Sequence, residues 1–279
     1  MSTLTISAAD VNKLRQQTGA GMMDCKKALT EANGDFEAAI DYLRKKGQKV
    51  AANRSDRDAN EGFVFGAVSA DGSFGATIML NCETDFVAIN QDFINFGQAL
   101  LNLVITNKVK SIDALKELSL DGVKVSDRLL DMVGKIGEKI DVTRLETIES
   151  NAVIAYNHPG NKLTALVGLS SNSDAAKAVG KDVAMQLAAM GAIAIDKDDV
   201  DPTFLAREVE IARELVRGEG KPEDMVEKIA QGKVAKILKE QTLLNQAYIK
   251  DDKITVAQLL SKTESGLAVK AIKRVQLGA

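Results

Sequence analysis

The chain has 279 residues, a net charge of −3, and hydrophobic and charged contents of 45% and 27%, which predict a soluble globular protein with two or three compact units. The weak negative charge and the 4% aromatic content argue against a general nucleic-acid binder, because phosphate contacts need basic surface and single strands need stacking platforms. No apolar run approaches the roughly 20 residues of a membrane span. Residues 1–5 lack the pattern of a secretory signal, and two cysteines do not make a disulfide framework, so we expect a cytoplasmic protein without membrane contact.

Residues 6–47 have the pattern of three short helices. A capping box at Ser7 starts the first helix, and Gly47 is expected to end the third. We assign residues 1–50 to this small unit, which has the size of a binding module. Met22 and Met23 stand about 100° apart on the second helix, so either one is exposed as an adaptable contact or both lie at the edge of the core.

Residues 51–60 contain no large apolar side chain and are expected to form a linker. Two stretches after it share one order of elements: strand, turn, strand and helix. The expected strands are 63–69, 74–80, 152–156 and 163–169, and the helix of the second copy is 173–190. We therefore divide the remainder into two repeated core subdomains, 61–145 and 146–279.

Three further elements are expected around these copies. Residues 126–140 have a helical pattern. Residues 203–240 have narrow apolar stripes and highly charged outer faces, which indicate a helical hairpin that extends from its domain or an ordinary surface hairpin. Residues 271–276 are expected to add a strand to the sheet of the second copy.

The stretch 81–87, with sequence NCETDFV, connects the second strand of the first copy to its helix. Thr84 and Asp85 are good cap residues. Phe86 comes three residues before Ile89 and shares its helix face, so the pattern alone favours a core position for Phe86 over a projecting one. The second copy has Ala175 and Ala176 at the matching positions, which argues mildly for a role of Phe86 beyond packing.

Chemistry for catalysis is not evident in the sequence. His158 is the single histidine, so a zinc site built on histidines is excluded, and the two cysteines form no CxxC pair. No phosphate loop GxxxxGK[ST] or nucleophile elbow GxSxG occurs. His158 stands in a Pro-Gly turn, where a solvent-facing histidine is the common case. We therefore expect a binding protein rather than an enzyme, with no cofactor and no metal ion.

Three motifs carry a resemblance to a known family. The run 14–29, LRQQTGAGMMDCKKAL, the stretch TDFV at 84–87, and GKIGE at 134–138 resemble the bacterial translation elongation factor Ts family in order and over nearly the whole chain. Lys139 departs from the Asn that usually follows the third motif. The resemblance implies an α+β fold, with an N-terminal three-helix ubiquitin-associated-like bundle, two ββα-type core subdomains and the protruding hairpin.

The resemblance also implies a function. Such a protein binds elongation factor Tu in its GDP-bound and nucleotide-free forms, displaces magnesium and promotes GDP release in translation elongation, without direct contact to nucleic acid. The residues implied to dislocate the magnesium ion are Thr84, Asp85, Phe86 and Val87. Those implied to contact the partner elsewhere are Arg15, Met22, Met23, Lys26, His158 and Ile249, with Lys250 standing where another apolar residue is usual.

Two rival interpretations stay open from the residues. A small enzyme or nucleotide-binding protein would need a phosphate loop or a paired base and nucleophile, and neither is found. A ubiquitin-associated-type adaptor would share the N-terminal bundle but would have no use for the TDFV stretch. In some members of the resembled family the hairpin serves self-association or partner contact, so a homodimer is left open.

Overall fold

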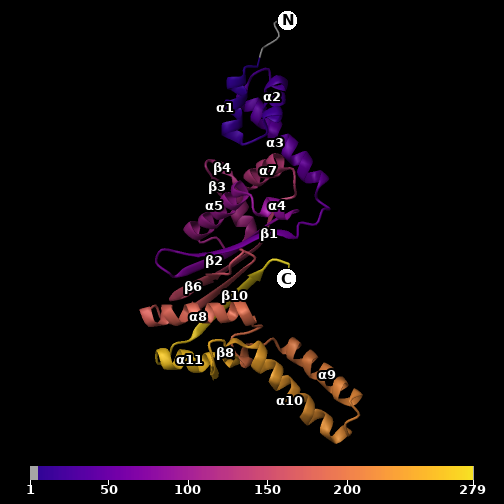
Figure 1. Cartoon of the computed structure of the whole chain (residues 1–279), viewed down its shortest axis with the longest axis vertical. Coiled ribbons are helices and arrows are strands. Elements are labelled where there is room, and N and C mark those ends of the chain that lie inside the picture. The colour runs from indigo at the N-terminus through magenta and orange to yellow at the C-terminus, as the bar shows by residue number, and fades with distance from the viewer. Residues whose placement is uncertain (1–5, 279) are drawn as a thin grey trace. The chain divides into compact units, whose positions relative to one another are not determined.

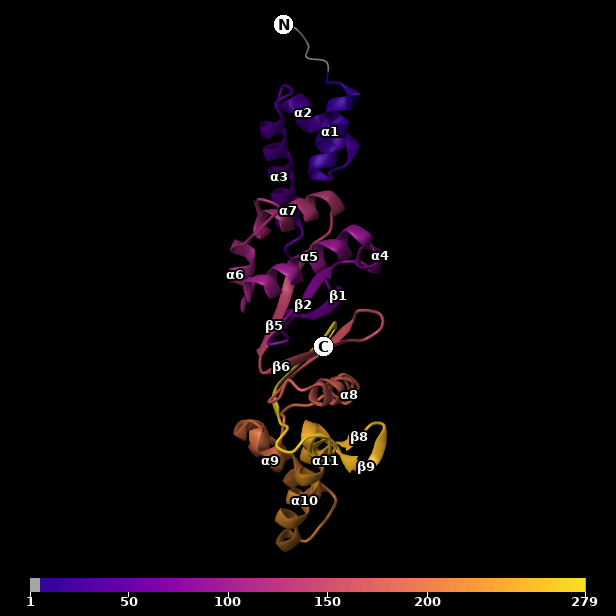
Figure 2. The same cartoon turned by 90° about the vertical axis from the view of Figure 1, so that its left-hand side faces the viewer.

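The computed structural model describes residues 6–278 and shows a mixed helix and sheet fold (Figures 1 and 2). Residues 1–5, in which we expected no secretory signal, lie outside the described residues. The chain divides into two compact units. Within the described residues, the segments are 6–65, 77–146 and 275–278 for the first unit, and 66–76 and 147–274 for the second. The α+β class expected from the sequence is confirmed.

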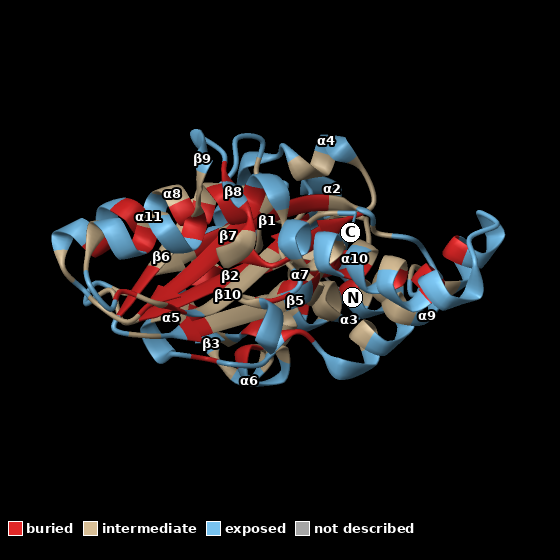
Figure 3. Ribbon diagram, turned by 90° about the horizontal axis from the view of Figure 1, so that it is seen from below, coloured by how far each residue is buried: buried red, intermediate tan, exposed pale blue. Residues whose placement is uncertain are grey.

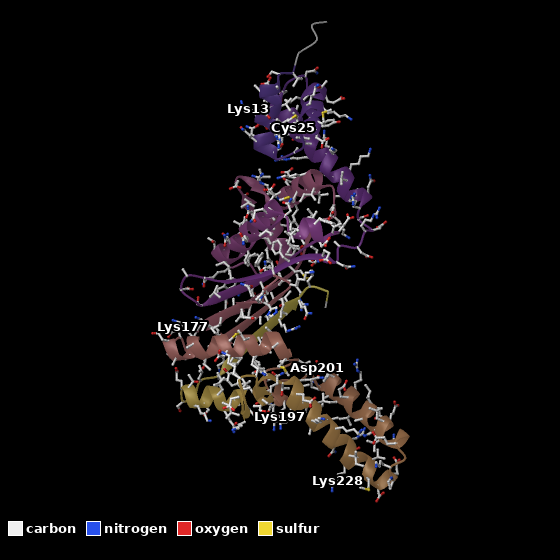
Figure 4. All side chains as sticks on the ribbon, viewed as in Figure 1. Lys13, Cys25, Lys177, Lys197, Asp201 and Lys228 are labelled. Atoms are coloured by element: carbon white, nitrogen blue, oxygen red, sulfur yellow. The ribbon has the colours of Figure 1, made fainter. Side chains whose placement is uncertain are left out.

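The first unit begins with a three-helix bundle: α1 (Ala8–Thr18), α2 (Met22–Glu31) and α3 (Phe36–Asn53). The first helix starts as the sequence predicts, because the Ser7 side chain accepts a hydrogen bond from a backbone amide of the first turn. Asp35 caps the third helix in the same way. The bundle core consists of Val11, Leu14, Cys25, Ala28, Leu29 and Ala39. Figure 4 shows Cys25 inside this bundle and Lys13 on its outside, where the Lys13 ammonium lies 4.9 Å from the Phe36 ring centre.

Helix α3 does not end at Gly47, as the sequence predicted, but continues to Asn53. The reason is a close helix crossing with α7 (Val125–Ile136). A Cβ atom at position 47 would lie 2.6 Å from the carbonyl oxygen of Leu130. Gly47 therefore serves close approach between helices and not helix termination.

The rest of the first unit contains most of the sheet formed by β1 (Glu61–Val68), β2 (Phe74–Cys82) and β5 (Asp141–Glu149), in the order β1-β2-β5. Its other elements are α4 (Asp85–Ala88), α5 (Gln91–Asn107), α6 (Ile112–Glu117), β3 (Ser119–Leu120) and β4 (Val123–Lys124). Helix α5 packs on the sheet through the edge-to-face contact of Phe93 with Phe63, whose ring centres are 5.3 Å apart.

Strand β5 was not expected from the sequence, which predicted a helix over 126–140. Helix α7 ends at Ile136 because Gly137 adopts a left-handed conformation with φ 82°. The chain then turns through Glu138 and Lys139 and enters β5 at Asp141. This turn brings residues 138 and 139 next to the end of β2, where the TDFV stretch begins.

The second unit contains the expected second copy: β6 (Ala152–Asn157), β7 (Leu163–Leu169) and α8 (Asp174–Met190). Strands β6 and β7 pair antiparallel from Ala152 with Leu169 to Asn157 with Thr164. Strand β10 (Val269–Gln276) completes the sheet in the order β10-β7-β6, as the sequence predicted. Both copies thus have a hairpin whose second strand is the central strand of a three-stranded sheet.

The expected helical hairpin is formed by α9 (Pro202–Gly218) and α10 (Glu223–Gln241). Its apolar seam contains Ala212, Ala230 and Val234, and the outer faces are largely exposed in Figure 3. Ion pairs link the two helices, with Arg213 Nε 2.7 Å from Glu227 Oε2. The remaining elements are η1 (Lys197–Asp199), η2 (Leu243–Asn245), β8 (Ala247–Tyr248), β9 (Asp251–Thr255) and α11 (Val256–Thr263).

Candidate partner-binding site

The TDFV stretch forms a single helical turn at the end of β2. Thr84 has extended backbone angles, φ −121° and ψ 153°, and is the N-cap of α4. Its hydroxyl oxygen accepts a hydrogen bond from the Val87 amide at 3.4 Å. The four residues of α4 include no buried side chain: Asp85 and Phe86 are exposed, and Val87 and Ala88 are half-buried.

Phe86 is 77% exposed and Ile89 is 76% exposed. The core position that the apolar pattern favoured for Phe86 is therefore wrong. The helix that the sequence places after the second strand of the first copy is broken at Asn90. The Asn90 side-chain oxygen caps a new helix by accepting from the amides of Asp92 and Phe93 at 2.9 and 3.4 Å. The break separates the face of Phe86 and Ile89 from the buried stripe of α5.

Two glutamates hold the segment just before this turn. The Glu138 carboxylate accepts hydrogen bonds from the amides of Glu83 and Thr84, both at 3.0 Å, and from the Thr84 hydroxyl at 2.7 Å. The Glu83 carboxylate in turn accepts from the Lys139 amide at 2.7 Å and from one Arg54 nitrogen at 2.8 and 2.7 Å. Charge-assisted bonds of this kind are the strong ones.

The charges around Glu83 and Cys82 affect their protonation. Burial opposes ionisation of Glu83, but the hydrogen bonds from Lys139 and Arg54 outweigh it and lower the pKa of that carboxyl below its ordinary value. Burial and then the negative charge of Glu138 raise the pKa of the Cys82 thiol to about 12. Glu83 is thus an ionised acceptor at neutral pH, and Cys82 is a protonated, buried thiol.

Sequence reasoning did not identify Ile89, Glu138 or Arg54 as parts of this site. The GKIGE motif marked Glu138 only as a family signature, and its contact with Thr84 joins residues 54 positions apart. The departure at Lys139 is accommodated, because that residue contributes its backbone amide to Glu83. Its side-chain nitrogen donates to the carbonyls of Ser55 and Arg57 at 2.7 and 3.0 Å.

The sequence-predicted contact residues of the bundle all lie on its surface. Arg15 and Lys26 are exposed, Met22 is 55% exposed and Met23 is 75% exposed. Both methionines are therefore accessible, which goes beyond the expectation that one would be. They form the first turn of α2, where Gly21 as N-cap offers no side-chain cap.

The other two predicted residues lie in the second unit. His158 is exposed in the turn between β6 and β7, where its Nδ1 lies 3.2 Å from the Tyr156 hydroxyl. Ile249 follows β8 and is 44% exposed. Its amide donates to Gln186 Oε1 at 2.8 Å, and Lys250 next to it forms a 2.7 Å ion pair with Asp182. Lys250 therefore anchors the segment that presents Ile249.

Within residues 6–278 no cluster of three or more histidine, cysteine, aspartate or glutamate side chains could hold a metal ion. Among the same residues, no helix is long and apolar enough to cross a membrane. Exposed apolar side chains, among them Phe86, Ile89 and Met23, are the kind of surface that suits contact with another protein.

Comparison with known proteins places this architecture in a family. Residues 83–279 match the family model for elongation factor TS. The chain is 51% identical over 277 residues to elongation factor Ts of Amoebophilus asiaticus, covering 99% of this chain and all of the relative. It is 49% identical to that of Christiangramia forsetii and 46% identical to that of Flavobacterium psychrophilum, each covering 98% of this chain and 99% of the relative. The chain therefore belongs to the elongation factor Ts family, whose members are guanine-nucleotide exchange factors of translation elongation.

Proposed function

We propose that this chain binds elongation factor Tu carrying GDP and magnesium, and accelerates GDP release by inserting Phe86 into the GTPase domain. The observation that carries the proposal is that Phe86 is 77% exposed on a capped turn whose N-cap residue, Thr84, is hydrogen-bonded to Glu138. A solvated aromatic side chain on a rigid support loses little conformational freedom when it enters a pocket.

The mechanism follows from linkage between two ligands of one protein. An exchange factor must bind the nucleotide-free partner better than the GDP-bound partner, and GDP then weakens its binding by the same factor. The diphosphate is held by its magnesium ion and by backbone amides of a phosphate-binding loop. Phe86 would wedge between helices beside that loop, and the exposed carboxylate of Asp85 would disturb groups that order the magnesium ion. Thr84 and Val87 would frame the wedge.

Other exposed residues would supply docking affinity. Arg15, Met22, Met23 and Lys26 would bring the bundle, proposed as residues 1–50, onto the GTPase domain. His158 and Ile249 would contact another domain of the partner from the second unit. Ile89 is added to this set because it is as exposed as Phe86 and lies on the same turn.

The proposed protein is a binding factor of the cytoplasm and not an enzyme. It makes no covalent change in GDP and needs neither direct nucleic-acid contact nor a cofactor of its own. The α9–α10 hairpin exposes Ile211, Leu215 and Met225, so it offers apolar surface for the partner or for a homodimer.

The test is the release of a fluorescent GDP analogue from purified elongation factor Tu in the presence of magnesium. The wild-type chain should accelerate release strongly, and Phe86→Ala should lose most of the acceleration while remaining folded. No acceleration by a folded wild-type chain would overturn the proposal and would favour the ubiquitin-associated-type adaptor. If Phe86→Ala were fully active, the exchange function would be retained, but Phe86 would not act as the wedge.

A further inference from the structure

The α4 turn has little support of its own. It is four residues long, has no buried side chain, and its single side-chain cap bond, from the Val87 amide to Thr84, is long at 3.4 Å. A one-turn helix gains little from its own backbone hydrogen bonds, because nucleation costs as much as it returns. The direction in which Phe86 points therefore depends on what holds residues 83 and 84.

Residues 83 and 84 are held by reciprocal hydrogen bonds with the turn at residues 138 and 139. Glu138 accepts from the amides of Glu83 and Thr84, and Glu83 accepts from the amide of Lys139. Each turn thus donates backbone amides to the glutamate of the other. The Thr84 hydroxyl bonds to Glu138 as well, so this carboxylate has three donors from two consecutive residues at the start of the turn.

Glu138 is itself held in place by the chain on both sides. Gly137 ends α7 in a left-handed conformation, which turns the chain toward the end of β2. On the other side of Glu138, the side-chain nitrogen of Lys139 donates hydrogen bonds to the carbonyls of Ser55 and Arg57. Glu138 therefore lies in a turn that is held on both sides. Its charge-assisted hydrogen bonds to Thr84 are strong enough to hold that residue in place as well.

We propose that Glu138 is a positioning residue for nucleotide exchange, which fixes the orientation of Asp85 and Phe86 before the partner binds. This inference rests on the proposed exchange function. Glu138 acts through Thr84 and not by contact with the partner. Without it, the turn would sample several orientations, and the wedge would have to be ordered during binding.

The test compares Glu138→Ala with Glu138→Gln and with a control, Glu117→Ala. Alanine removes all three acceptor contacts. Glutamine keeps a carbonyl oxygen for the two amides and an NH₂ group that can donate to the Thr84 hydroxyl, so it should rescue much of the function. Glu117 also has a partner, Lys124 at 2.6 Å, but it lies in α6.

The kinetic readout is GDP release from elongation factor Tu over a range of factor concentrations. Glu138→Ala should lower the maximal release rate about ten- to a hundredfold, the size of effect that misplacement by about 1 Å produces. The half-saturating concentration should change much less, since the bundle still docks. Glu138→Gln should stay near the wild type and Glu117→Ala should equal it. An unchanged maximal rate in Glu138→Ala would overturn the positioning role while exchange itself stands.

A second readout does not depend on exchange. Amide hydrogen exchange of the peptide that contains residues 84–90 should accelerate about tenfold or more in Glu138→Ala, since opening becomes easier as its free energy falls, and should not change in Glu117→Ala. Melting curves check that the fold persists. Unchanged protection in folded Glu138→Ala would contradict the inference, even if the wild-type chain failed to release GDP.

Discussion

Gly47 of α3 and Gly134 of α7 face each other where the two helices cross, and a Cβ atom at Gly134 would lie 3.1 Å from the Gly47 Cα. The crossing attaches the last helix of the bundle directly to the helix that leads into Glu138. Helix α3 continues to Asn53, past the boundary expected at residue 50.

The crossing predicts that Gly47→Ala destabilises the first unit. The new methyl group would meet the Leu130 carbonyl oxygen at 2.6 Å, and overpacking of this kind costs about 1–3 kcal/mol. The matched control is Gly232→Ala in α10, where the methyl group would enter open space and should stabilise the helix by roughly 0.5–1 kcal/mol. Chemical denaturation measures the free energy of unfolding of both variants. If Gly47→Ala were as stable as Gly232→Ala, α3 and α7 could accommodate the methyl group, and the close crossing would not require glycine.

Phe86 and Phe93 give opposite predictions for the same substitution. Phe86→Ala should change the free energy of unfolding by no more than about 0.5 kcal/mol, because the ring is solvated. Phe93→Ala should cost about 3–5 kcal/mol, because Phe93 is fully buried against Phe63. Thermal or urea unfolding measures the free energy of unfolding of both variants. A large loss of stability in Phe86→Ala would mean that Phe86 packs in the core.

Ile89→Ala should weaken partner binding on the order of tenfold. The loss corresponds to about 1–2 kcal/mol of apolar burial if Ile89 enters the same contact as Phe86. Ile193→Ala is the control, since Ile193 is 49% exposed but lies in the second unit, outside the proposed contact set. Calorimetric titration of nucleotide-free elongation factor Tu measures both, and equal affinities of the two variants would exclude Ile89 from the contact.

Met22 and Met23 should contribute to docking but not to the exchange step. The double variant Met22→Ser, Met23→Ser removes two exposed apolar side chains and should raise the concentration needed for half-maximal GDP release. The maximal rate should be unchanged, because these contacts are made equally before and during release. A lower maximal rate would place the bundle in the exchange step as well.

Asp182 should contribute to stability in a pH-dependent way. Burial opposes its ionisation, but the hydrogen bonds from Lys250 and Tyr248 outweigh it and lower the pKa of that carboxyl below 3.8. A lowered folded-state pKa means that the stabilisation is fully present above pH 3.8 and is lost as the pH falls through the folded value. Asp182→Asn should therefore cost on the order of 1 kcal/mol at pH 7.

The same variant should differ less from the wild type as the pH falls below 3.8. Urea unfolding at several pH values gives the comparison. A stability difference that stays constant down to the most acidic pH would mean that the charge of Asp182 is not what stabilises the Ile249 segment.

Much of the fold was predictable because its signals are local. Ser7, Asp35 and Thr84 cap helices through bonds to residues three positions away, and each is visible in a short stretch of sequence. The hairpin over β6 and β7 and the helical hairpin over α9 and α10 likewise follow from alternation, stripes and turn residues. The TDFV stretch was located correctly for the same reason.

The sequence by itself determined the N-terminal three-helix bundle, the repeat of the ββα unit, the helical hairpin and the place of the TDFV stretch directly after β2. Tertiary structure decided the exposure of Phe86 and Ile89, the passage of α3 through Gly47, and the contact of Glu138 with residues 83 and 84. Local patterns could not reveal these, because a helix face is buried or exposed according to what packs on it. The Glu138 contact joins residues 55 positions apart, so it forms only when the chain ends α7 and pairs β5 with β2.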